Sequence, residues 1–124
     1  MNIVDSSAWL AYLTEEKNAG HFAEAVEDYL NLIIPTVVIY EVTKRMMASF
    51  GEDSVIEVGT HLQRGCVIPL TDYLAILAAK ISREEKLGMA DSIILATART
   101  YSATLWTQDA DFKKIKVVKY FAKK

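Results

Sequence analysis

Short apolar runs recur along the chain and are separated by longer segments of mixed polarity. Short continuous apolar runs are typical of strands that are covered on both faces of a sheet. We therefore expect strands at residues 3–4, 32–34, 66–70, 104–107 and 116–120.

The segments between these runs repeat their apolar residues with the period of an α-helix. We expect helices over residues 6–13, 19–30, 36–50, 52–63, 71–87 and from residue 90 onward. Ser6 or Ser7 is a suitable N-cap for the first helix, and Thr71 or Asp72 for the fifth. Gly88 is expected to end the fifth helix.

Strands therefore alternate with helices along the whole chain. This order is typical of an α/β fold in which helices cover both faces of a parallel sheet. We expect a three-layer α/β/α architecture with a central, mostly parallel sheet of about five strands. There is no linker or internal repeat, and 124 residues is the length of one domain, so residues 1–124 are expected to form a single domain.

The composition indicates a globular protein, because hydrophobic residues make up 52% of the chain and charged residues 24%. No run approaches the roughly 20 apolar residues of a membrane helix. The segment Met1–Asp5 lacks the basic flank of a signal peptide. We expect a soluble, cytoplasmic protein with no membrane partner.

The net charge of −2 argues against a generally basic surface for nucleic acid, but charge is unevenly distributed. No acidic residue follows Asp111, whereas lysines are frequent there: Lys113, Lys114, Lys116, Lys119, Lys123 and Lys124. These lysines have two interpretations. They form a positive patch for a polyanion, or they protect an edge strand from pairing with another chain.

The single cysteine, Cys66, lies in an apolar run with no second cysteine or histidine nearby. We expect a reduced thiol buried in the core. His21 and His61 lie in polar helical segments and are expected at the surface, without a catalytic role.

Carboxylates stand where the expected strands end. Asp5 follows the first strand directly, Asp109 lies two residues past the fourth, and Asp91 lies in the first turn of the helix before the fourth. Glu41 interrupts an apolar helix, where an acid must face solvent or be paired. Glu41, Asp91 and Asp109 each have an ordinary explanation when taken alone, such as an exposed helix position or a turn. Asp5 is the hardest to explain in this way, because it stands at the junction of a buried strand and a helix. Together the four acids are expected at the crevice beyond the carboxyl ends of the strands.

Carboxylates gathered at one point repel one another unless a cation lies among them. Oxygen ligands without histidine or cysteine favour Mg²⁺ or Mn²⁺. Such ions activate water and stabilise both the attacking and the leaving oxygen of a displacement at phosphorus. The acids therefore predict metal-dependent hydrolysis of phosphodiester bonds.

The acids lie in Ile3–Ser7, Pro35–Val42, Met89–Ala98 and Leu105–Phe112, in this order along nearly the whole chain. Together these segments resemble the PIN domain, and within it the VapC-type toxins of type II toxin–antitoxin pairs. The resemblance implies a Rossmann-like sheet and an endoribonuclease that depends on Mg²⁺ or Mn²⁺. It also implies a homodimer that is inhibited by a small antitoxin protein.

The resemblance assigns roles by position. It implies that the catalytic metal ligands are Asp5, Glu41, Asp91 and Asp109. It implies that auxiliary positions beside the site are Asp111, Thr107 and Ser7. Ser92 departs from the family, because a small apolar residue is commoner there, but the acidic set is complete.

Other features keep two interpretations. Lys44 and Arg45, one turn after Glu41, and Lys113 and Lys114 are candidates for RNA phosphate contacts, or they are ordinary solvated charges. An apolar pair of helices is either core or in part a dimer or antitoxin surface: Met46, Met47, Phe50, Val55, Ile56 and Val58. Trp9 and Tyr12 are expected in the core, with base stacking as the alternative.

The same acids distinguish the expected nuclease from other classes of protein. A phospho-accepting receiver domain needs paired acids at the first strand, and a haloacid-type phosphatase needs an acid where Ser7 stands. Two alternatives remain within the PIN-like fold. One is an RNA-processing nuclease and the other a non-catalytic binding module.

Overall fold

A computed structural model describes residues 1–124 and has a five-stranded sheet at its centre. The strands are β1 (Asn2–Val4), β2 (Leu32–Pro35), β3 (Cys66–Ile68), β4 (Thr104–Thr107) and β5 (Val118–Tyr120). They lie in the order β3-β2-β1-β4-β5, and every neighbouring pair is parallel. The expected parallel sheet is confirmed.

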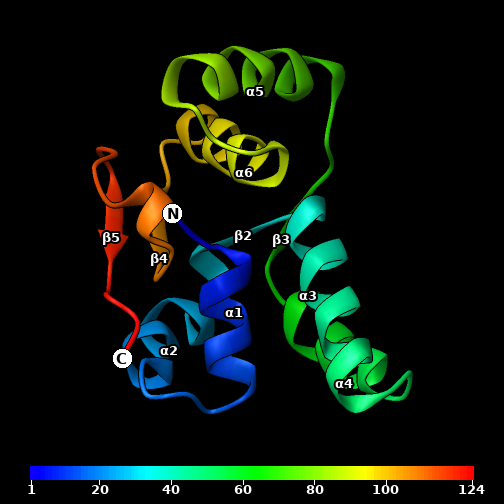
Figure 1. Ribbon diagram of the computed structural model, residues 1–124. Helices are drawn as coiled ribbons and strands as arrows, with labels where there is room; N and C mark the ends of the chain where they lie inside the picture. The colour runs from blue at the N-terminus through cyan, green and yellow to red at the C-terminus, as the bar shows by residue number, and fades with distance from the viewer.

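Helices flank this sheet. They are α1 (Ser6–Leu13), α2 (Ala19–Glu27), α3 (Thr36–Phe50), α4 (Ser54–Leu62), α5 (Asp72–Glu85) and α6 (Met89–Thr100). In Figure 1, α5 and α6 lie on one side of the strands and α1 and α2 on the other, while α3 and α4 stand beside the β2–β3 end. The three-layer α/β/α class is confirmed. No helix in the structure is both long enough and apolar enough to span a bilayer.

The strand order reverses between β1 and β4. The chain runs outward from β1 to β2 and β3, and then crosses back through α5 and α6 to β4 on the other side of β1. In the β1–β4 pair Val4 stands opposite Trp106, so both strands end at the same level. In open α/β sheets, ligands bind at such a reversal of strand order, beyond the carboxyl ends of the strands. The reversal in this sheet brings Asp5 and Asp109 to one place.

The core lies on both faces of the central strands. Ile3, Val4, Ile34 and Leu105 are fully buried, which explains why their strands are continuous apolar runs in the sequence. Trp9 is also fully buried, so its expected place in the core holds and its side chain is not free to stack on a base.

The edge strand β3 differs from expectation. Cys66 and Val67 are exposed, because β3 pairs only with β2 and is not covered on both faces. The prediction of a buried thiol at Cys66 is therefore wrong. An apolar run in the sequence does not distinguish a central strand from an edge strand.

Two helices, α2 and α5, end earlier than expected. α2 ends at Glu27, and a short 3-10 helix, Tyr29–Asn31, follows, in which the Asn31 side chain donates to the Asp28 carboxylate. Leu30 is consequently 84% exposed. This local side-chain bond competes with helix continuation.

α5 ends before Gly88 rather than at it. Thr71 caps its first turn as expected, by accepting from the Leu74 amide at 3.2 Å. At the other end Lys86 takes the left-handed conformation, with φ of 57°, and Gly88 precedes α6 with an ordinary extended φ of −66°. The turn returns Leu87 to the core, where only 6% of it is exposed.

Candidate metal centre

Asp5 occupies the junction between β1 and α1 and is 2% exposed. One carboxylate oxygen accepts from the Ala8 amide at 2.9 Å and the Ser7 hydroxyl at 2.8 Å, and the other accepts from the Thr107 hydroxyl. Asp5, rather than Ser6 or Ser7, is thus the N-cap of α1. The prediction of Ser6 or Ser7 as the N-cap is therefore wrong, because aspartate and serine both cap helices and the sequence alone does not distinguish them.

Burial raises the pKa of Asp5 from its usual 3.8 to about 6. The hydrogen bonds from Thr107, Ala8 and Ser7 act in the opposite direction, and the carboxylate of Asp109 adds to the rise. A carboxylate with this pKa is ionised at neutral pH at a cost in free energy, which a nearby cation would remove.

Asp91 lies in the first turn of α6 and is half-buried. Burial raises its pKa from 3.8 to about 7, and further contributions come from the carboxylates of Asp109, Asp5, Glu41 and Asp111 in that order. Each of these five influences raises the pKa of Asp91, and none of them is a basic side chain. The helix N-terminus position alone therefore does not explain Asp91, because it faces every other acid of the predicted set.

Asp109 and Asp111 lie on a 3-10 helix, Ala110–Phe112, that follows β4. The Asp109 carboxylate caps this helix by accepting from the Asp111 amide at 2.9 Å. One carboxylate oxygen from each of Asp91, Asp109 and Asp111 lies within 4.8 Å of the others. Asp111, predicted only as an auxiliary residue, thus belongs to the central group by geometry.

Glu41 approaches from α3 on the other side of β1. Its carboxylate accepts a hydrogen bond from the hydroxyl of Ser6, and it is only partly exposed. Sequence reasoning left open whether this acid faces solvent or is paired, and the structure pairs it with Ser6. The role of Ser6 was missed, since its contact spans 35 positions in the sequence.

Thr107 connects the two strand ends. Its hydroxyl donates to Asp5 and accepts from the Asp109 amide at 2.9 Å, and the residue is fully buried. Ser7 and Thr107, the predicted hydroxyl positions, therefore both contact Asp5 directly.

Replacing Thr107 with valine removes both bonds with little change in shape. We expect metal affinity to fall about 10–100-fold, the usual effect of losing a group that orients a ligand. The unpaired Asp109 amide should also lower the free energy of unfolding by about 1–2 kcal/mol. Titration calorimetry with Mn²⁺ and urea unfolding measure the two effects, with Thr104→Val at the opposite end of β4 as the control. Equal affinity in both variants would contradict the role of Thr107.

Gln108 was also missed by sequence reasoning. It is 8% exposed, accepts from the Asn18 side chain at 3.1 Å and donates weakly to the Ser7 carbonyl at 3.5 Å. It therefore ties the segment before Asp109 to α1. No local pattern marks such a residue, because Asn18 lies 90 positions away.

The donor set fits a hard divalent cation. It consists of carboxylate oxygens that repel one another, and both histidines lie elsewhere. The exposed His21 ring stacks on Phe121 at 4.5 Å, and the half-buried His61 ring stands edge-on to Tyr12 at 6.0 Å. Carboxylate ligands without nitrogen or sulfur donors favour Mg²⁺ or Mn²⁺.

The structure separates the predicted phosphate-binding residues. The Lys44 ammonium lies over the Tyr40 ring at 5.7 Å, whereas Arg45 lines a cleft together with Ser7. Lys113 and Lys114 line a different hollow, which also contains Asp111 and two glutamates, Glu84 and Glu85.

The apolar pair α3–α4 is divided between core and surface. Met46 and Val58 are buried, while Phe50 and Ile56 are 62% and 76% exposed. Part of this pair therefore remains available to a partner.

Comparison with known proteins gives a family and a fold. Residues 3–118 match the family model described as PIN domain. A comparison with curated protein sequences gives no match.

Solved structures of the same fold cover nearly the whole chain. A toxin–antitoxin complex from Klebsiella pneumoniae is 21% identical with a TM-score of 0.83, and the alignment covers 98% of this chain and 99% of that one. The sarcin–ricin loop cleaving toxin VapC20 of Mycobacterium tuberculosis is 17% identical with a TM-score of 0.76, covering 94% and 95%. VapBC2 of Rickettsia felis, bound to a promoter DNA fragment, is 16% identical with a TM-score of 0.72, covering 98% and 97%. At these identities the similarity establishes a shared fold.

Proposed function

The chain belongs to the PIN domain family, and on this basis we propose that it is an endoribonuclease that depends on Mg²⁺ or Mn²⁺. One observation carries the proposal. One carboxylate oxygen from each of Asp91, Asp109 and Asp111 lies within 4.8 Å of the others, and the carboxylates of Asp5 and Glu41 also raise the pKa of Asp91. Carboxylates that lie this close together lower the stability of the folded state unless a cation binds among them.

The proposed metal ligands are Asp5, Glu41, Asp91 and Asp109, with Asp111 as a further one. A bound divalent cation would lower the pKa of water for attack and neutralise charge on the phosphate. The protein's own contribution is to hold the ligands in place. Thr107 and Ser7 fix the Asp5 carboxylate, and Ser6 fixes that of Glu41.

The metal should stabilise the protein increasingly as pH rises. The pKa values of Asp5 and Asp91 lie above 3.8, at about 6 and about 7, so the folded state holds protons that the unfolded state has released. Metal-free stability should therefore fall between about pH 4 and pH 7 and stay low above that range. A cation competes with these protons, so its stabilisation should grow over the same range.

At neutral pH and 100 times Kd, Mn²⁺ should raise the melting temperature by roughly 10 °C. Scanning fluorimetry with Mn²⁺ or EDTA at several pH values measures this. Asp91→Asn should abolish the response, while Asp72→Asn, also in the first turn of a helix, should keep it. A response independent of pH, or equal in both variants, would contradict a carboxylate metal site.

RNA as the substrate is tested directly by cleavage. Labelled single-stranded RNA and DNA of one sequence are incubated with the protein in Mg²⁺, Mn²⁺ or EDTA. We expect cleavage of RNA only, and only with metal. Metal-dependent stabilisation without cleavage of any strand would favour a non-catalytic binding module.

We further propose that the chain is the cytoplasmic toxin of a toxin–antitoxin pair, with a small antitoxin as its partner. The neighbours described as toxin–antitoxin complexes support this role. Expression should arrest growth, and co-expression of a small adjacent gene product should relieve the arrest. Cleavage of RNA without growth arrest would instead favour an RNA-processing nuclease.

A homodimer is also proposed, with the exposed part of α4 around Val55 and Ile56 as a surface for it or for the antitoxin. Light scattering at micromolar concentration measures the mass. Ile56→Glu tests this surface, because a charge would be buried there in a complex.

A further inference from the structure

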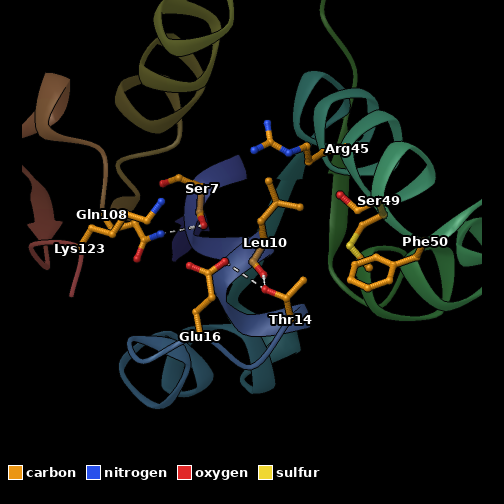
Figure 2. Close-up of a pocket in the computed structure, with 10 residues that line it drawn as sticks. Ser7, Leu10, Thr14, Glu16, Arg45, Ser49, Phe50, Gln108 and Lys123 are labelled. Atoms are coloured by element: carbon orange, nitrogen blue, oxygen red, sulfur yellow. Dashed lines mark hydrogen bonds between the residues drawn. The ribbon is translucent and has the colours of Figure 1, made fainter.

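A polar cleft of about 370 Å³ opens beside the carboxylates, between α1 and α3. Figure 2 shows Ser7 and Leu10 of α1, and Thr14 directly after it, between two walls. Arg45 and Phe50 of α3 lie on one wall, and Gln108 and Lys123 on the other. The cleft is thus built from segments that are far apart in the sequence.

The cleft lies next to the candidate metal centre, although no proposed metal ligand lines it. Ser7 lines the cleft and donates its hydroxyl to Asp5. Gln108 also lines it and is followed directly by Asp109. A strand whose reacting phosphate lies at the carboxylates would therefore continue into this cleft.

Lys123 is held at the cleft by the residues before it. The Phe121 amide donates to the Thr107 carbonyl at 2.9 Å, and the Asn18 side chain donates to the Ala122 carbonyl at 3.0 Å. The Phe121 ring also stacks on Trp106, with centroids 6.1 Å apart. Figure 1 shows the end of the chain beside α2, where this anchoring places it.

Basic side chains in the cleft are needed to attract a polyanion to this site. The carboxylates repel phosphate, and the whole chain has a net charge of −2, so attraction must be local. Arg45 and Lys123 supply it from opposite walls. The cleft contains one acid, Glu16, whose carboxylate accepts from Thr14 at 3.1 Å. By contrast, the hollow of Lys113 and Lys114 contains acids that cancel their charge, as noted above.

The cleft best matches a single nucleic-acid strand as its ligand. The Phe50 ring lines the cleft and is 62% exposed, which allows a base to stack on it. Cations that follow a backbone, combined with an exposed aromatic ring, are the usual means of holding unpaired nucleotides.

We propose that this cleft holds the single-stranded RNA next to the scissile bond, with Arg45 and Lys123 contacting its phosphates from opposite walls. The inference rests on the proposed nuclease function and extends it. Lys123 takes part as one defined contact, not as a member of a diffuse basic tail.

Binding of a labelled single-stranded RNA, measured by fluorescence anisotropy in EDTA, tests this without cleavage. Each phosphate contact on a single strand contributes about 0.7 to the slope of log affinity against log salt. Arg45→Gln and Lys123→Gln should each reduce the slope by about 0.7 and weaken binding about five-fold at 0.1 M salt. The double variant should lose about 25-fold, and Lys123→Arg should bind like the wild type.

Two controls carry the same charge change outside the cleft. Arg99→Gln and Lys124→Gln replace exposed residues and should leave affinity and slope unchanged. Equal losses for Lys123→Gln and Lys124→Gln would overturn the proposal in favour of a diffuse tail. Wild-type affinity for Arg45→Gln, or no RNA binding by the wild type, would overturn it as well.

Failure of the nuclease proposal would look different. In that case RNA would bind with the expected variant effects in EDTA and remain intact after Mg²⁺ or Mn²⁺ is added. The cleft would then stand as an RNA site without catalysis.

Discussion

Replacing Asp5 with asparagine is expected to abolish RNA cleavage and, at the same time, to stabilise the metal-free protein. Loss of a group that only orients a ligand typically lowers activity 10–100-fold, so loss of a ligand itself should exceed about 100-fold. Asparagine keeps the shape of the side chain and remains a good N-cap for α1. Loss of activity would therefore follow from the missing charge.

The gain in stability follows from the raised pKa. A rise from 3.8 to about 6 corresponds to about 3 kcal/mol against the ionised carboxylate in the folded state. Asparagine avoids this cost above about pH 6, although its amide suits the Thr107 hydroxyl less well, so we expect a gain of about 1–3 kcal/mol. Below about pH 4 the carboxyl group is protonated in both states, and the gain should vanish.

Urea unfolding in EDTA at pH 4 and pH 8, together with single-turnover cleavage in Mg²⁺, measures both effects. Asp53→Asn, at a helix start where the aspartate side chain makes no capping bond, should change neither quantity. An Asp5→Asn protein that cleaves RNA at the wild-type rate would disprove the assignment of Asp5. An Asp5→Asn protein that is less stable than the wild type at pH 8 would disprove that ionisation of Asp5 lowers the stability of the folded state.

The second large effect is expected for Phe112→Ala. Phe112 is fully buried and ends the 3-10 helix that contains Asp111 and is capped by Asp109. Truncating a buried phenylalanine to alanine lowers the free energy of unfolding by about 3–5 kcal/mol. Since the whole fold is stabilised by about 5–15 kcal/mol, this is a large fraction. The melting temperature should fall by roughly 10–20 °C.

Because the ring anchors the turn that positions these acids, metal affinity should fall too, measured below the melting temperature of the variant. Phe112→Leu should retain most of both properties, because it fills much of the same space. Tyr73→Ala, at an aromatic residue that is 62% exposed, should change stability by less than about 0.5 kcal/mol. Similar stability losses for Phe112→Ala and Tyr73→Ala would show that Phe112 does not anchor the turn.

Local patterns predicted most of the fold. α3 runs from Thr36 to Phe50, as the spacing of its apolar residues and the glycine that follows it predicted. The apolar runs that became β1, β2 and β4 are buried, because these strands lie at the centre of the sheet. The end of each central strand followed from its sequence, so the positions of Asp5 and Asp109 could be anticipated as well.

What the sequence did not predict depends on long-range contacts. The order of parallel strands is set by how the crossovers pack, and so the position of β3 at the edge, with Cys66 exposed, was missed. The bond between Ser6 and Glu41 and that between Asn18 and Gln108 join distant segments. No periodicity or spacing encodes such pairs.

The exposed Cys66 has a practical consequence for work in solution. It is the only thiol of the chain and lies on β3, at the opposite edge of the sheet from β5. A fluorophore or spin label can therefore be attached at one known position without further mutation. The same thiol can join two chains through a disulfide in air. A dimer seen without reductant therefore counts as native only if it persists in Cys66→Ser.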